Sequence, residues 1–302
     1  MLDEMRTFVV LAESGSLQRA SERLFLTPSA VTRQIQRLEA ALKTALLDRR
    51  VKPGRITREG QAVLDRGRQM LRIVDDLKAS SANDAEPSGI FRIGLSHALA
   101  QPSLVASIQR LTSRFPGLQP VLSTDLRQQL IEKVRTGELD VALAFLGTAD
   151  TIPGDLASSV LATESLVLVK ARGPQPRPRR SSKSKDHTLD GRWVLNPPGC
   201  FARAALETRL RELGSPLEVA AAINNIDMQV SLVASGIGFG LIPSRFLATH
   251  PKRRRLERIP RSGVSIEASI VFVQAAHLGR LESAATFLER EFRSHFADRV
   301  VR

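Results

Sequence analysis

Residues 27–42 read TPSAVTRQIQRLEAAL, and this stretch predicts how the amino-terminal part of the chain folds. Thr27 is a favoured residue at the position before a helix, and Pro28 suits the first helical position because its missing N–H would have had no partner there. An apolar stripe follows at helical spacing, made of Val31, Ile35, Leu38 and Leu42. The stretch is therefore predicted to be a helix that packs on its neighbours through this stripe.

The face opposite the stripe carries hydrogen-bond donors. At about 100° per residue, the side chains that project from it are Ser29, Thr32, Arg33, Gln36 and Arg37. Such side chains can reach base edges and phosphates in a DNA major groove. Periodicity alone allows equally well an ordinary helical hairpin with a solvated polar face.

Two shorter helices are predicted ahead of this one. Apolar residues recur at helical spacing from Leu2 to Ala12, and Gly15 ends the pattern. Ser16 can cap a second helix, in which Ala20 and Leu24 form an inner face. Two helices joined by a tight turn, the second with a donor-rich face, are typical of a helix-turn-helix.

The segments 8–49 and 56–60 carry a pattern that goes beyond periodicity. The positions that match it are Phe8, Ala12, Gly15, Ser16, Ala20, Leu24, Ser29, Ala30, Val31, Gln34, Ile35, Leu38, Glu39, Leu42, Arg49, Thr57 and Gly60. In this pattern the chain resembles the DNA-binding domain of LysR-type transcriptional regulators, and so many matches in register are a specific signal. The resemblance favours DNA readout over the solvated hairpin.

The resemblance implies a winged helix-turn-helix over residues 1–58. Its wing would consist of strands Leu46–Arg50 and Arg55–Thr57 around Pro53-Gly54. The residues then expected to contact DNA are Pro28, Ser29, Thr32, Arg33, Gln36 and Arg37 on the helix, with Arg49, Arg50, Lys52 and Arg55 on the wing. Lys43 and Leu47 stand where the family usually has Gly and Phe, and Gln18 and Ser21 also depart from it; we interpret these differences as local repacking.

A long helix is predicted from Arg58 to about Ala82, because no proline interrupts it. Its apolar seam has 4-3-4-3 spacing and consists of Val63, Gly67, Met70, Val74 and Leu77. Such a seam favours a coiled coil with a second subunit, and the family resemblance implies an antiparallel homodimer through this helix and a homotetramer. The alternative is a helix that packs only on its own domain. Residues 59–89 are thus a linker helix followed by a polar hinge, Ser80 to Gly89.

From residue 90 onward, strand-like runs alternate with helical patterns. The runs include FRIGL, LQPVLST, LDVALAF, SLVLVK, RWVLN, LEVAAAI, FGLIP and SIEASIVFV. This alternation predicts βαβ units with a parallel sheet and two open α/β lobes, lobe I at about 90–160 and 265–302 and lobe II at about 161–264. FRIGLS, Phe115-Pro116, GELDVALAF, NPPG with Arg203, and VASGIGFGLIP are similar to the LysR-type effector-binding domain, which itself resembles periplasmic solute-binding proteins.

The resemblance implies a ligand between the lobes, at the carboxyl ends of the strands, where helix N-termini favour an anionic headgroup. On this chain it indicates Ser96 and His97, the stretch Thr124 to Arg127, and the stretch Asn196 to Phe201. Within the last stretch, the candidates are Asn196, Pro197, Cys200 and Phe201. Each has a plainer interpretation: Ser96 as a helix cap, His97 as a solvated loop residue, Cys200 as a small buried hydrophobe and Phe201 as core.

Composition narrows the function classes. A chain of 302 residues that is 42% apolar can build two or three cores. The start of the chain is acidic and amphipathic, unlike a secretory signal, and the whole sequence contains no run of 18 apolar residues. We therefore expect a cytoplasmic protein that does not bind membranes. A single cysteine and no evident ligand cluster predict neither a metal nor a cofactor. Gly236, Gly238 and Gly240 do not form a dinucleotide-binding motif, because they follow a helix and enter a strand.

The net charge of +13 favours a polyanionic partner, yet much of it lies outside residues 1–60. Two dense basic stretches, 170–185 and 252–261, are expected to be exposed loops that could touch DNA beside the operator.

The resulting hypothesis is a LysR-type regulator that binds double-stranded promoter DNA, responds to a small anionic metabolite and is not an enzyme. RNA polymerase is a further partner to consider. The alternative is a cytoplasmic solute-binding module without DNA readout.

Overall fold

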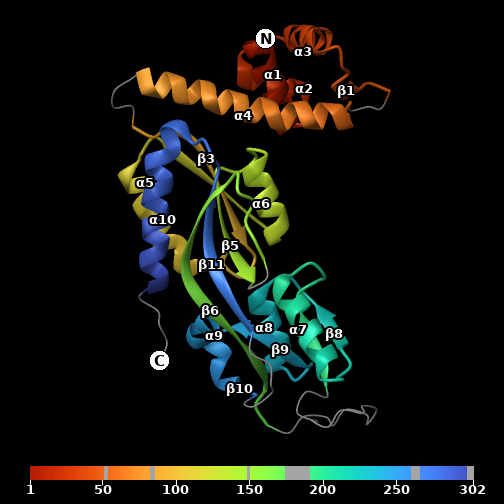
Figure 1. The fold of residues 1–302 in the computed structure, drawn as a ribbon, viewed down its shortest axis with the longest axis vertical. Helices are drawn as coiled ribbons and strands as arrows, with labels where there is room; N and C mark the ends of the chain where they lie inside the picture. Colours follow the sequence, from red (N-terminus) through yellow and green to blue (C-terminus); the bar gives the residue numbers. More distant parts are fainter. Residues whose placement is uncertain (51–53, 82–85, 148–149, 174–190, 260–265, 298–302) are drawn as a thin grey trace.

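A computed structural model describes residues 1–50, 54–81, 86–147, 150–173, 191–259 and 266–297. Three parts follow one another along the long axis of the molecule: a small helical domain, one long helix that crosses the molecule, and a larger α/β domain (Figure 1). This order matches the predicted order of a helical domain, a linker helix and an α/β domain.

The amino-terminal domain contains the three predicted helices, α1 (Leu2–Ser14), α2 (Leu17–Leu24) and α3 (Pro28–Leu42). The Thr27 hydroxyl accepts a hydrogen bond from the Ala30 N–H at 3.2 Å, which confirms the predicted cap of α3. Gly15 ends α1 with a φ of 61°. Ser16 stands before α2, but its side chain makes no capping hydrogen bond, so that part of the prediction was wrong. The stripe of α3 packs against Phe8, which is fully buried.

A short wing follows α3, formed by β1 (Leu47–Asp48) and β2 (Arg55–Ile56), which pair antiparallel. Both strands are shorter than predicted, and the predicted turn residue Pro53 lies outside the described residues, as does Lys52. The Glu39 carboxylate accepts hydrogen bonds from the N–H groups of Leu46 and Leu47 at 2.9 and 3.2 Å, so the end of α3 positions the wing.

The backbone conformation at Lys43 shows why the family usually has a glycine at this position. This residue ends α3 with a φ of 51°, in the left-handed region that glycine enters without cost. The usual glycine therefore fits this position for a backbone reason. A lysine here adopts the same conformation with some strain, and the chain path into the wing is kept.

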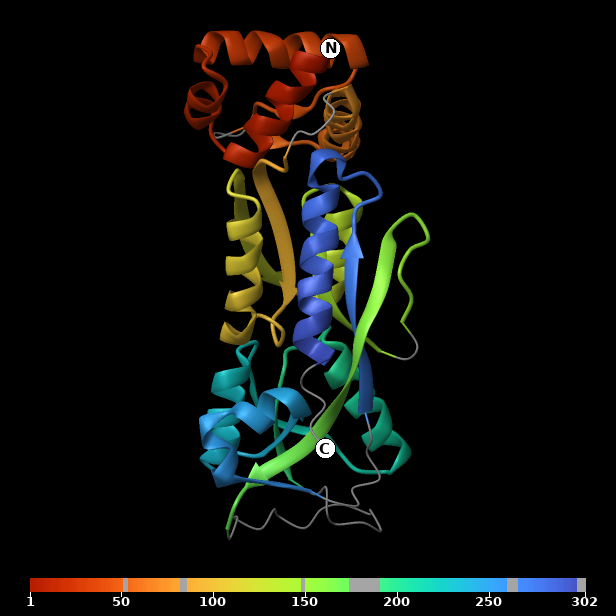
Figure 2. The ribbon, with the colours of Figure 1, turned by 90° about the vertical axis from the view of Figure 1, so that its left-hand side faces the viewer.

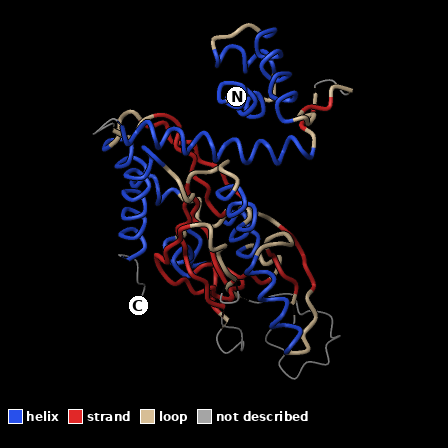
Figure 3. Tube along the Cα trace, turned by 45° about the horizontal axis from the view of Figure 1, so that its top comes forward, coloured by secondary structure: helices blue, strands red, loops and turns tan. Residues whose placement is uncertain are grey.

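The linker helix α4 (Arg58–Ser81) agrees closely with its predicted extent. It separates the amino-terminal domain from the α/β domain, as the tube in Figure 3 shows. The first half of the predicted seam packs within the chain. Val63 and Met70 pack on the core of the amino-terminal domain, and a Cβ at Gly67 would collide with the Met5 side chain. These positions pack on their own domain, as the alternative proposed, whereas Leu77 in the second half is 64% exposed.

Lobe I of the sensor is built around β3 (Gly89–Ser96), which pairs in parallel with β4 (Leu118–Asp125) and β5 (Val141–Gly147). Helices cover both faces of this sheet (Figures 1 and 2). The helices on one face are α5 (Val105–Arg114), preceded by η1 (Pro102–Leu104), and α10 (Glu282–Ala297), preceded by η4 (Gly279–Leu281); α6 (Arg127–Arg135) covers the other. Phe91, Phe272 and Phe292 are fully buried between these layers.

Lobe II has its own parallel core. β7 (Arg192–Leu195) lies between β8 (Glu218–Ala222) and β9 (Phe239–Pro243), with α7 (Phe201–Glu212), α8 (Ile226–Ala234) and α9 (Ser244–Thr249) packed around them. Gly236 follows α8 with a φ of 79°, and a Cβ at Gly238 would collide with the backbone of Arg192. This confirms the interpretation of these glycines as a helix end and a close strand approach.

Two long strands join the lobes, β6 (Ala157–Ala171) and β11 (Ile266–Gln274). β6 pairs antiparallel with β11 in lobe I and, from Leu166 onward, antiparallel with β9 in lobe II. The two lobes are confirmed, but the sheet is mixed: parallel pairing is confined to β4-β3-β5 in lobe I and β8-β7-β9 in lobe II, and β11 pairs antiparallel with β5. The predicted lobe boundary at 160/161 falls within β6.

The second basic stretch is not a loop over its first part. Residues Pro251–Arg255 form a 3₁₀ helix, η3, and Leu256–Arg258 form β10, which pairs antiparallel with the end of β6. The loop prediction for 252–258 was therefore wrong, and residues 170–171 likewise belong to β6. Residues 174–185 and 260–261 lie outside the described residues. Within the described chain, every helix is too short or too polar to cross a membrane.

Candidate functional site

The outer face of α3 is the first candidate site, and it is open to solvent. Pro28, Ser29, Arg33, Gln36 and Arg37 are exposed, whereas Thr32 is half-buried and its hydroxyl donates to the Pro28 carbonyl at 2.9 Å. The face thus has the geometry that the sequence predicted. Contact of these side chains with DNA remains a prediction.

The arginines of the wing are partly engaged within the domain. An Arg49 Nη donates to the Glu39 carboxylate at 2.7 Å, and Arg50 binds Asp48 at 2.9 Å. The hydrogen bond from Arg50 holds the pKa of Asp48 below its ordinary value. Arg55 is exposed on the second wing strand. In this structure Arg49 therefore positions the wing against α3, in addition to its predicted role toward phosphates.

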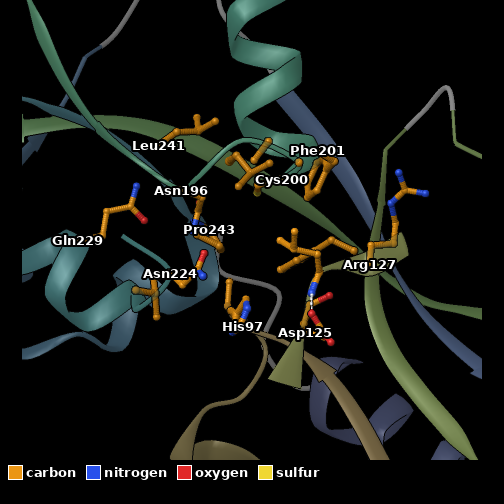
Figure 4. Close-up of a pocket in the computed structure, with 18 residues that line it drawn as sticks. His97, Asp125, Arg127, Asn196, Cys200, Phe201, Asn224, Gln229, Leu241 and Pro243 are labelled. Atoms are coloured by element: carbon orange, nitrogen blue, oxygen red, sulfur yellow. Dashed lines mark hydrogen bonds between the residues drawn. The ribbon is translucent and has the colours of Figure 1, made fainter. Parts of the chain in front are cut away.

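The second candidate site is a cleft of about 60 Å³ between the two lobes (Figure 4). Lobe I contributes the residues that follow β3 and β4, and lobe II contributes the residues that follow β7 and β8. Six predicted residues line it: Ser96, His97, Arg127, Asn196, Cys200 and Phe201. The rule that ligands bind at the carboxyl ends of strands therefore identified the correct region.

Two predicted residues do not line the cleft. Thr124 is exposed on β4, and because side chains alternate along a strand, the next residue, Asp125, lines the cleft instead. Pro197 is half-buried in its loop without contributing to the lining. Both corrections concern neighbouring positions within the correct loops.

Sequence reasoning also missed several lining residues. Asn224 lies two residues after the end of β8, so the rule that ligands bind at strand ends would have indicated it too. Gln229 lies on α8 and donates to the Val194 carbonyl at 2.9 Å, a contact that only the packed lobe brings together. The apolar wall consists of Phe145, Leu166, Ile226, Leu241 and Pro243. No sequence signal indicated that these strands and helix α8 would meet at one cleft.

The charges at the cleft are already paired. Lys133 donates to Asp125 at 3.0 Å, a hydrogen bond that raises the pKa of Lys133, and Arg127 binds Asp150 at 2.8 Å. In Figure 4 the guanidinium of Arg127 points away from the middle of the cleft. His97 and Asn224 approach from opposite lobes, so the cleft presents imidazole and amide hydrogen-bonding groups beside an apolar wall.

Cys200 precedes α7 and lines the cleft. Burial raises the pKa of its thiol, and backbone N–H groups of α7 oppose that rise. The thiol is consequently protonated at neutral pH and is a poor nucleophile, which fits the sequence interpretation of a small buried hydrophobe.

Alkylation of Cys200 by iodoacetamide at pH 7 is expected to be at least about tenfold slower than alkylation of free cysteine, because the thiolate is the reacting species. The rate should increase as the pH rises, since the raised pKa delays ionisation. Intact mass spectrometry can follow the reaction without ambiguity, as the chain has one cysteine. Urea-unfolded protein is the control; a native rate equal to the unfolded rate would contradict a shielded thiol.

Comparisons with known proteins identify the family of both domains. Residues 2–61 match the model of the bacterial regulatory helix-turn-helix protein, lysR family, and residues 84–292 match the LysR substrate binding domain. The HTH-type transcriptional activator IlvY of Salmonella typhimurium is 29% identical over 265 residues, which cover 86% of this chain and 89% of IlvY.

Solved structures show the same fold. A full-length OxyR variant from Pseudomonas aeruginosa is 20% identical, with a TM-score of 0.75 over 97% of both chains. ArgP from Mycobacterium tuberculosis is 15% identical, with a TM-score of 0.69 over 96% of both chains. Since the substrate-binding model alone spans more than half of the sequence, the chain belongs to the LysR family of transcriptional regulators, with a helix-turn-helix DNA-binding domain and a two-lobed effector-binding domain.

Proposed function

We propose that this regulator reads promoter DNA with the exposed face of α3 and changes its DNA binding when a small molecule occupies the cleft between the lobes. The observation that carries the proposal is the composition of the cleft, which takes polar groups from the strand ends of both lobes and an apolar wall from their cores. A ligand held by both lobes binds one lobe arrangement more tightly than another and so shifts their populations. The regulator acts in the cytoplasm, where its DNA is.

The effector is a small anion with an apolar part. Its charged group lies near the first turn of α7, where backbone N–H groups and the helix dipole favour negative charge, with the Asn196 and Asn224 amides as donors. Because Arg127 is bound to Asp150, it neutralises the effector only if that ion pair opens. A volume of about 60 Å³ holds only a few water molecules, so effector binding also widens the cleft.

The regulator forms a homodimer through the second half of α4. Ile73 and Leu77 are 44% and 64% exposed and lie one turn apart, whereas the first half of the helix packs on its own domain. A pair of dimers would place recognition helices at a fixed spacing on the operator. RNA polymerase is a candidate partner of the promoter-bound assembly.

A mobility-shift assay with DNA upstream of the regulator's own gene and neighbouring genes tests the DNA-binding half of the proposal. We expect a sequence-specific shift at moderate salt that changes when an effector is added. Failure to shift any such DNA, with or without candidate metabolites, would instead support the solute-binding module.

Asn224→Leu is expected to weaken effector binding about tenfold or more, because it removes an amide that lines the cleft at similar side-chain volume. The effector is first found by thermal-shift screening of a metabolite library, since a ligand of the folded cleft raises the apparent stability. The variant should then lose most of that shift.

Gln109→Leu on the exposed surface of α5 is the matched control, because it removes an amide far from the cleft. It should keep the full shift. Equal responses of the two variants would show that the metabolite binds elsewhere.

A further inference from the structure

A second and larger cavity, of about 360 Å³, lies where the DNA-binding domain, the linker helix and lobe I meet. Its walls come from α1, α2, α4, β3 and η4, so it is bordered by all three parts of the molecule. Its charged lining consists of the arginines 6, 23, 68, 72, 92 and 280 and of the carboxylates of Glu13, Asp75 and Asp140. The described lining therefore holds six cations and three anions, and outside it Asp65 and Glu138 lie 3.8 and 3.9 Å from Arg68.

The three carboxylates are occupied by four of the arginines. Asp140 binds Arg72 at 2.7 Å, and Asp75 lies 3.7 Å from Arg6. Glu13 is shared by Arg92 at 3.3 Å and Arg23 at 3.5 Å. No carboxylate of the described lining pairs with the remaining two guanidinium groups, those of Arg68 and Arg280.

Arg68 is the more unusual of the two. Its side chain is 10% exposed, and its Nη1 lies 3.8 Å from Asp65 and 3.9 Å from Glu138, both beyond hydrogen-bonding distance. Its Nε and Nη1 are buried without a hydrogen-bond partner among the described residues. Buried N–H groups of a cation rarely stay unsatisfied, because their desolvation is costly. Arg68 also lines the cavity, so a change of its rotamer toward an anion bound there would give these N–H groups an acceptor.

Arg280 faces the cavity from the sensor side. It is exposed on η4, and its Nη2 would lie 2.9 Å from a Cβ at Gly89, where β3 begins with a φ of 91°. The absence of a side chain at Gly89 therefore lets this guanidinium lie close over the start of β3. Arg68 on α4 and Arg280 on η4 thus border one cavity from two different parts of the protein.

We propose that this junction cavity is a binding site for a small multivalent anion of the diphosphate class, held between Arg68 and Arg280. Guanidinium groups donate two parallel hydrogen bonds to phosphoryl oxygens, so two arginines suit two phosphoryl groups. The anion would bridge the linker helix and the sensor. It would also be independent of the effector cleft, which no residue of this cavity lines.

Isothermal titration of the full chain with inorganic pyrophosphate, at constant ionic strength in sodium chloride, tests the proposal. We expect one saturable site. Arg280→Gln should weaken its affinity at least about tenfold, since each charge-assisted hydrogen bond contributes strongly to anion binding. Arg68→Gln should have a similar effect, and because Arg280 is exposed, Arg280→Gln should also retain the wild-type melting temperature.

Two controls separate this site from other sources of binding. Arg110→Gln removes one surface arginine that pairs with Glu291 on α10, away from the cavity, and should bind pyrophosphate like the wild type. Asn224→Leu in the effector cleft should also leave binding unchanged. The proposal is overturned by an absence of saturable binding, by equal affinity in Arg280→Gln, or by a loss of affinity in either control.

Discussion

Arg72→Ala is expected to destabilise the protein by about 3–5 kcal/mol, as breaking a buried ion pair from one side generally does. Arg72 on the linker helix donates to Asp140 at 2.7 Å and to the carbonyls of Gly137 and Leu139 at 2.9 and 3.0 Å. The Asp140 side chain is 3% exposed. Removal of the guanidinium leaves this carboxylate buried without its counter-ion.

The loss of stability in Arg72→Ala should depend on pH. Burial raises the pKa of Asp140 above its ordinary value of 3.8, and Arg72 opposes this rise. In the variant the pKa of the folded state therefore rises further. A carboxyl whose pKa is raised by folding does not lower the free energy of unfolding while the pH is below its unfolded-state pKa. It lowers that free energy progressively as the pH rises from there through the folded-state pKa. The deficit of Arg72→Ala should consequently be smaller at pH 5 than at pH 7.

Urea unfolding followed by circular dichroism measures both effects. The second variant is Arg72→Ala with Asp140→Asn, which removes the uncompensated charge and keeps an oxygen for the Arg92 N–H that now donates to Asp140. It should recover a substantial part of the loss at pH 7. A single variant as stable as the wild type, or a double variant less stable than the single one, would contradict this account of the junction.

Arg33→Ala combined with Gln36→Ala is expected to abolish most sequence-specific DNA binding. Each base contact contributes about 1–3 kcal/mol, so each substitution should weaken operator binding about tenfold to a hundredfold. Both side chains are exposed on α3, opposite the buried stripe, so the fold should be unaffected.

Fluorescence anisotropy with a labelled operator at one fixed salt concentration is the appropriate measurement, because phosphate contacts make affinity salt-dependent. Arg110→Ala on the sensor is the matched control and should bind like the wild type. Unchanged operator affinity in the double variant, with an unchanged melting temperature, would exclude this face as the DNA reader.

The amino-terminal domain was predicted well because its signals are local. The cap at Thr27, the stripe through Ile35 and the glycine at the end of α1 each act within one or two helical turns. The same holds for most strands of the sensor, whose apolar runs are buried on both faces and therefore stand out in the sequence. The cleft could be located because it lies at the carboxyl ends of strands, and these ends can be identified once the strands have been predicted.

Sequence patterns did not reveal the contacts that connect distant segments. The seam of α4 has the spacing of a coiled coil, but spacing does not distinguish a second subunit from Met5 of the same chain. The pairing of Arg49 with Glu39 and the strand β10 beside β6 are likewise set by partners remote in sequence.

Local patterning is thus sufficient for the helix-turn-helix, the linker helix and the α/β alternation of this regulator, because backbone capping and apolar periodicity act over a few residues. The continuous strands β6 and β11, the narrow effector cleft and the arginine-rich junction cavity are properties of the packed molecule. They depend on long-range strand pairing and on which charges burial brings together. Long-range strand pairing and the burial of charges produce no periodic pattern in the sequence, because the partner of each residue depends on the whole tertiary structure.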